Sequence, residues 1–124
     1  MLKGAQFIEF KGKQIYYVDY SGIKTNEEFL EAIKQSNAFR EKIRAEGKRN
    51  LLMLVDITGS YVYGEVLNEI KKAGKITKLL TSREAVVGVN GGKRILLNIV
   101  QSFTNMNLKA FDTLEEAMEW LVKM

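Results

Sequence analysis

The feature that constrains this chain most is the uninterrupted apolar run over residues 50–57, NLLMLVDI. A strand with one solvated face alternates apolar and polar residues, whereas a strand covered on both faces is apolar throughout. The run therefore predicts a central strand of a parallel sheet with helices on both faces. Residues 85–89 (AVVGV) form a shorter run of the same kind and predict a second buried strand.

The other elements follow from local patterns. Residues 6–10 and 14–20 are rich in aromatic and β-branched residues, which predicts two strands joined by a hairpin turn at Lys11-Gly12-Lys13. Residues 108–111 predict a short last strand. Apolar residues at helical spacing predict four helices, and Thr25 and Thr113 each begin a capping box ahead of the first and the last. The predicted helices are the one after Thr25, residues 65–78, residues 93–105 and the one after Thr113.

This order predicts an α/β fold. We expect a mixed sheet of about five strands, an N-terminal hairpin followed by parallel strands, flanked by about four helices. Strands alternating with helices imply right-handed crossovers. The chain has 124 residues and no proline, and no segment is typical of a linker, so residues 1–124 are expected to form a single domain.

Composition excludes common chemistries. The chain contains no cysteine and no histidine, which removes disulfides, thiolate nucleophiles, the usual general base and the commonest metal ligands. We therefore expect no metal, no cofactor and no catalytic residue, and a non-enzymatic role. An enzyme would need a carboxylate such as Asp56, or a lysine, to work without histidine. No segment is long and apolar enough for a membrane span or a signal peptide, which predicts a cytoplasmic protein.

Charge is unevenly distributed along the chain. The formal net charge is +4, with seven basic residues and one acidic residue over residues 71–94 and a mostly acidic segment over residues 112–124. Solvated helix faces explain this pattern, and a basic surface for an acidic partner or a phosphate is the alternative. Nucleic-acid binding is disfavoured because no aromatic residues are interleaved with the basic ones.

The first candidate site follows the central strand, since ligands of parallel sheets bind beyond the carboxyl ends of the strands. Asp56 closes the apolar run and needs a partner or water. Thr58 and Ser60 precede a predicted helix, where hydroxyl groups either cap the helix or bind a phosphoryl group. Tyr61 and Tyr63, in the same predicted loop, either line a small-molecule cleft or form a contact patch.

The second candidate site is a glycine turn that leads into a predicted helix. Backbone N–H groups of such a turn, together with basic side chains, can form an anion cradle, and a tight strand-to-helix connection is the alternative. The residues concerned are Asn90, Gly91, Lys93 and Arg94. Asp112 is predicted to cap the last helix.

Five segments together resemble the SpoIIAA-like small proteins, which are related in fold to STAS domains. They are residues 17–22 (YVDYSG), 54–59 (LVDITG), 85–91 (AVVGVNG), 93–98 (KRILLN) and 109–121 (KAFDTLEEAMEWL). The resemblance spans about residues 15–122 and implies a mixed sheet flanked by helices. It implies no activity. STAS antagonists carry a phosphorylatable serine in an Asp-Ser-Ser-Gly motif, which residues 59–67 lack; Ser60 does not match its position.

The sequence and the resemblance together predict a cytoplasmic, non-enzymatic STAS-like module that binds a regulatory protein partner through residues 58–63 and 90–94. The alternative is a carrier of an anionic or lipid-like small molecule, whose charged end is held by Gly91, Gly92, Lys93 and Arg94. The predicted edge strand over residues 6–10 is open to pairing with a second copy, which leaves a homodimer as a further prediction. The identity of the partner or ligand does not follow from the sequence.

Overall fold

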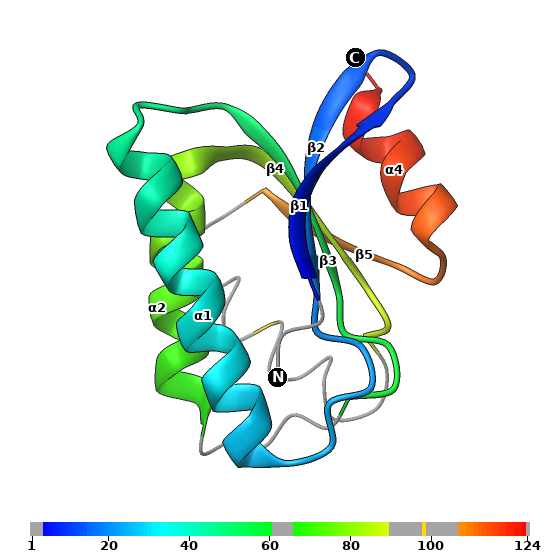
Figure 1. Cartoon of the computed structure of the whole chain (residues 1–124). Coiled ribbons are helices and arrows are strands. Elements are labelled where there is room, and N and C mark those ends of the chain that lie inside the picture. Colours follow the sequence, from blue (N-terminus) through cyan, green and yellow to red (C-terminus); the bar gives the residue numbers. More distant parts are fainter. Residues whose placement is uncertain (1–3, 61–65, 90–97, 99–106, 124) are drawn as a thin grey trace.

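The computed structural model describes residues 4–60, 66–89, 98 and 107–123. These residues form a five-stranded sheet with helices on both faces (Figure 1). The α/β architecture with a mixed sheet is thereby confirmed. The elements are β1 (Gly4–Phe10), β2 (Lys13–Asp19), α1 (Asn26–Ala45), β3 (Leu51–Asp56), α2 (Leu67–Leu80), β4 (Thr81–Val87), β5 (Leu108–Phe111) and α4 (Leu114–Val122).

The strands lie in the sheet in the same order as in the sequence. β1 and β2 pair antiparallel, and β2, β3, β4 and β5 pair parallel. Lys11 (φ 51°) and Gly12 (φ 81°) both adopt positive φ, as a two-residue hairpin turn of the favoured twist requires. The helical connections between successive parallel strands place α1 and α2 on one face of the sheet, and α4 covers the opposite face (Figure 1).

The two predicted capping boxes are confirmed. The Thr25 hydroxyl accepts a hydrogen bond from the Glu28 backbone N–H at the start of α1, and Thr113 does the same for Glu116 at the start of α4, both at 3.1 Å. The prediction that Asp112 caps the last helix is wrong. The extended backbone of Thr113 (φ −129°, ψ 154°) aims its own hydroxyl at the first turn, and the exposed Asp112 stands one residue too early.

Two apolar clusters fill the two faces of the sheet. Alternate residues of β3 point into each: Met53 and Val55 lie under α1 and α2, and Leu54 lies under α4. Burial on both faces is what the apolar run predicts, so the central-strand prediction is confirmed. The α4-side cluster consists of Ile15, Leu54, Ala85, Val87, Ala117 and Leu121.

The observed ends of some strands and helices differ from the predicted ones. β4 begins at Thr81 rather than at residue 85, because its first four residues are polar and a pattern of apolar residues does not detect them. The helix predicted over residues 65–78 is α2, which begins at Leu67 and continues through the buried Gly74 to Leu80. The helix predicted over residues 93–105 lies outside the described residues, apart from Asn98. The described part of the chain therefore contains three of the four expected helices.

Candidate functional site

The carboxyl ends of β2, β3 and β4 lie side by side, and the loops that follow continue their pairing. The Tyr20 N–H donates to the Asp56 carbonyl at 2.8 Å, and the Gly22 N–H donates to the Thr58 carbonyl at 2.9 Å. The Ile57 N–H donates to the Val87 carbonyl at 2.9 Å. We call this region, residues 19–22, residues 56–60 and Gly88, the carboxyl edge. Backbone hydrogen bonds hold its loops in one arrangement.

Gly88 allows the loop after β3 to lie directly on the end of β4. Its φ is +91°, and a Cβ built there would lie 2.5 Å from both Cα and N of Thr58. Only glycine combines this backbone conformation with so close an approach. The predicted strand over residues 85–89 is therefore wrong in its last two residues, since β4 ends at Val87 and Gly88 makes the bend.

Two carboxylates stand next to each other at this edge. Asp19 and Asp56 are register partners on parallel strands, so their side chains lie on the same, α4-side face of the sheet. One carboxylate oxygen of Asp19 accepts from the Ser21 N–H, and one of Asp56 accepts from the Thr58 N–H, both at 2.9 Å. The sequence predicts that Asp56 needs a polar partner. The structure supplies one from its own loop, the backbone N–H of Thr58.

Tyr17 lies on the same face of β2 as Asp19, two residues before it. Partial burial of the phenol, the nearby charges of Asp19 and Asp56 and a hydrogen bond to Asp56 raise the pKa of Tyr17 to about 12. The hydroxyl therefore stays neutral at physiological pH. Tyr17 and Asp19 are not among the predicted site residues, although their spacing places both on one strand face beside the carboxyl end.

The loop after β3 turns its hydroxyl groups in different directions. The Ser60 hydroxyl is buried and donates to the Ile57 carbonyl at 2.7 Å. Thr58 and Gly59 are exposed, and the Gly59 carbonyl accepts from the Lys24 ammonium at 2.6 Å. The surface that this loop offers to a partner is therefore formed by Thr58 and Gly59, and Ser60 has a structural hydrogen bond.

Of the predicted site residues, the structure brings Asp56, Thr58 and Ser60 together in one loop. The others lie outside the described residues, and their roles stay predictions: Tyr61, Tyr63, Asn90, Gly91, Lys93 and Arg94. In the part of the chain that is described, no three acidic side chains gather as metal ligands would. No helix among the same residues is long and apolar enough to cross a bilayer.

Comparisons with known proteins agree with this fold. The model of the SpoIIAA-like family matches residues 15–122. The chain is similar to a solved structure of an uncharacterised protein of the DUF3478 family, with a SpoIIAA-like fold, from Shewanella loihica PV-4. The TM-score is 0.70 at 16% sequence identity, and the match covers 95% of this chain and 92% of the other. A search of curated proteins finds no match. The chain belongs to the SpoIIAA-like family.

Proposed function

We propose that this protein is a non-enzymatic binding module whose carboxyl edge contacts a regulatory protein partner. The observation that supports the proposal most is the set of backbone hydrogen bonds that joins the loop at Tyr20–Gly22 to the loop after β3, and that loop to β4. A surface that is already ordered loses little conformational entropy when a partner binds. The exposed Gly22, Thr58 and Gly59 form the outer part of this surface.

The side chains at the edge support binding rather than catalysis. Asp56 and Ser60 use their polar atoms to hold their own loop, and a group engaged in this way is poorly placed to exchange protons with a substrate. The chain also lacks histidine and cysteine, the side chains that most often serve as bases and nucleophiles near neutral pH.

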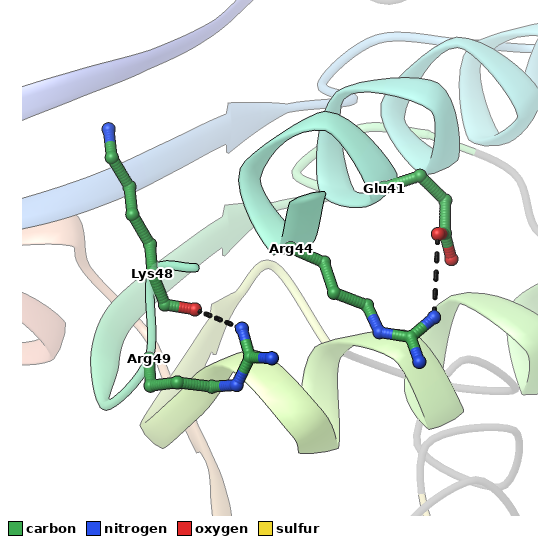
Figure 2. A network of polar contacts seen from close by, with 4 residues as sticks. All are labelled: Glu41, Arg44, Lys48 and Arg49. Carbon is green, nitrogen blue, oxygen red and sulfur yellow. Dashed lines mark hydrogen bonds and ion pairs between the residues drawn. The ribbon is translucent and has the colours of Figure 1, made fainter. Parts of the chain in front are cut away.

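The opposite edge of the sheet gives a useful contrast. The connection from α1 to β3 carries exposed basic side chains that make local contacts (Figure 2). Arg49 donates to the Lys48 carbonyl at 2.7 Å, and Arg44 pairs with Glu41 at 3.5 Å one turn away on α1. Exposed pairs of this kind contribute little to stability. Arg49 is therefore a suitable position for a control substitution, remote from the carboxyl edge.

The alternative function, a carrier of an anionic or lipid-like ligand, depends on Gly91, Gly92, Lys93 and Arg94 and stays a prediction. Nothing in the described residues favours it. Asp19 and Asp56 place two carboxylates side by side at the described part of the edge, and their charge repels an anion bound there.

Affinity capture from an extract of the protein's own host tests the proposal. The bait is the full chain as wild type, with Thr58→Arg, or with Arg49→Ala. A bulky charged side chain at a contact position costs more than about 1.4 kcal/mol of binding, so Thr58→Arg should reduce the captured partner at least about tenfold. Arg49→Ala should capture as the wild type does. Undiminished capture by a folded Thr58→Arg variant would remove the carboxyl edge from the proposed interface.

A further inference from the structure

A buried polar cluster lies between α1 and the sheet, on the face away from α4. Arg40 is 2% exposed, and Glu84 on β4 is 9% exposed. The Arg40 guanidinium donates to the Ser36 hydroxyl at 2.6 Å and to the Tyr20 hydroxyl at 3.3 Å. The two hydroxyl groups also share a hydrogen bond, and Ser36 donates to the Ile33 carbonyl at 2.9 Å. Arg40 is thus bound to Tyr20 and Ser36.

Glu84 also lies between α1 and the sheet, but within the described part of the chain its carboxyl group is not hydrogen-bonded as the Arg40 guanidinium is. Among the described residues no hydrogen bond or ion pair reaches its carboxyl group. The register places Tyr16, Met53 and Glu84 in one row across β2, β3 and β4, with Met53 fully buried in the middle. The charge of Arg40 acts on Glu84, although no hydrogen bond or ion pair between the two is found among the described residues.

The environment of Glu84 favours its neutral form. Burial raises the pKa of this carboxyl group to about 7, and the positive charge of Arg40 offsets only part of that effect. Arg40 keeps its charge, since its guanidinium is hydrogen-bonded and its pKa lies above the ordinary value. Glu84 therefore changes charge near neutral pH, next to an arginine that does not.

The other groups around Glu84 cannot take over this role. From β2 and its end, Tyr16 and Tyr20 face the cluster, and burial raises the pKa of Tyr16 above its usual value. β3 contributes Met53 and β5 contributes Leu108 beside Glu84. Among described residues of α2, Thr77 is buried, and the lysines Lys72, Lys75 and Lys78 are exposed. In the described part of the chain, the charge that acts on Glu84 is that of Arg40.

Tyr20 links this cluster to the carboxyl edge. Its hydroxyl contacts Arg40 and Ser36, and its ring stacks on Phe29 of α1 with centroids 5.5 Å apart. Its backbone N–H donates to the Asp56 carbonyl, one of the bonds that lock the edge loops. A change at the hydroxyl of Tyr20 is therefore carried by one rigid side chain to the loop that presents Gly22.

We propose that Arg40 and Glu84 couple a buried proton to the carboxyl edge. When Glu84 is protonated, Arg40 stays bound to Tyr20 and Ser36. When Glu84 loses its proton to solvent, the new negative charge draws the guanidinium towards it and away from the Tyr20 hydroxyl, and the loop at residues 20–22 shifts. That this shift alters partner binding rests on the proposed function; the coupling itself does not.

An NMR titration of the isotope-labelled full chain, from about pH 5 to about pH 9, tests the coupling without any partner. The Glu84 side-chain carboxyl and the amides of Tyr20 and Gly22 should titrate together with a midpoint near pH 7. Glu84→Gln should abolish the shared transition, and the exposed Glu9→Gln should leave it unchanged. A Glu84 midpoint near its ordinary value of 4.5, or Tyr20 and Gly22 amides that do not follow Glu84, would overturn the proposal.

A second variant separates the link from the titrating group. Tyr20→Phe removes the hydroxyl that Arg40 contacts and keeps the ring on Phe29. Glu84 should still titrate near neutral pH, but the Gly22 amide should lose its response; a retained response would exclude Tyr20 as the link. Because no partner is present, a failed titration leaves the proposed binding surface standing. A failed affinity capture likewise leaves the coupling standing.

Discussion

The two faces of the sheet are both covered by helices, but they bury different kinds of side chain. Under α4 the buried cluster is entirely apolar and is built from short side chains such as Ala85, Val87 and Ala117. Under α1 and α2 the apolar cluster surrounds a buried arginine, Arg40, and a buried glutamate, Glu84, and no ion pair between them is found among the described residues. The contribution of the apolar α4-side cluster to stability therefore depends on no titratable member of that cluster, whereas the contribution of the α1-side cluster depends on the charge of Glu84.

The largest expected losses of stability come from truncating the side chains of two neighbouring β3 residues, Met53 and Leu54, which point to opposite faces of the sheet. Met53→Ala and Leu54→Ala should each lower the free energy of unfolding by about 2–5 kcal/mol, because both side chains are fully buried. Urea unfolding at mildly acidic and mildly alkaline pH measures the difference. The loss in Leu54→Ala should be the same at both. In Met53→Ala it should be smaller at alkaline pH, since the space opened beside Glu84 admits water to the carboxylate. Equal losses at both pH values for both variants would abolish the contrast.

The pH dependence of stability gives the next largest effect. The pKa of Glu84 is raised to about 7 in the folded chain from 4.5, so between these values the folded state binds a proton that the unfolded state has lost. The stabilisation is complete below pH 4.5 and is lost as the pH rises through 7. Its size is about 3 kcal/mol, from about 1.4 kcal/mol for each pH unit.

Denaturant unfolding of the wild type and of Glu84→Gln across this range measures that contribution. Subtracting the two curves removes the contributions of all other carboxyl groups. The difference should fall steadily from acidic to mildly alkaline pH. A flat difference would mean that Glu84 is not held neutral by burial.

Tyr17 on β2 and Tyr20 just after it allow the two faces of the sheet to be compared by removing a single hydroxyl group from each. Tyr20→Phe removes a buried hydroxyl bound to Arg40 and Ser36, which should cost about 1–2 kcal/mol. Tyr17→Phe removes the hydroxyl of a partly buried side chain on the opposite face, which is hydrogen-bonded to Asp56, and should cost less, about 0.5–1 kcal/mol. Thermal or urea unfolding compares them, and a larger loss in Tyr17→Phe would reverse the assignment of the polar face.

The smallest expected difference between the two faces comes from removing the N-cap hydrogen bonds of α1 and α4. Thr25 and Thr113 make equivalent caps at the starts of α1 and α4, so each Thr→Ala substitution should cost about 1 kcal/mol. The two faces should not differ in this respect. Unfolding of both variants, with the exposed Thr58→Ala as a control for loss of a threonine that caps no helix, checks this equality.

Much of the fold was accessible from the sequence, because its strongest signals are local. The run over residues 50–57 predicts the doubly covered β3, and the two threonine caps predict where α1 and α4 begin. The apolar pattern does not predict the start of β4, since Arg83 and Glu84 are polar residues in a strand whose inward side chains are buried by tertiary contacts. The prediction for Asp112 is wrong because two neighbouring residues both suit a cap, and backbone geometry selects Thr113.

The candidate site was only partly accessible. Asp56 and Thr58 could be selected because they follow a buried strand. The register that sets Asp19 beside Asp56, and the contact that requires glycine at residue 88, depend on strand pairing far apart in sequence. The Arg40–Glu84 cluster does not follow from the sequence. Helical spacing can place Arg40 on the inner face of α1, but it does not explain why that buried position holds an arginine rather than an apolar residue.

Site-specific photo-crosslinking in the protein's own host tests the central claim, a protein interface at the carboxyl edge, most directly. A photoreactive residue is placed at Thr58 in one variant and, as a matched control, at the exposed Glu115 on α4 in another. We expect a discrete protein adduct at position 58 that is absent at position 115. No adduct at position 58, or the same adducts at both positions, would contradict the claim.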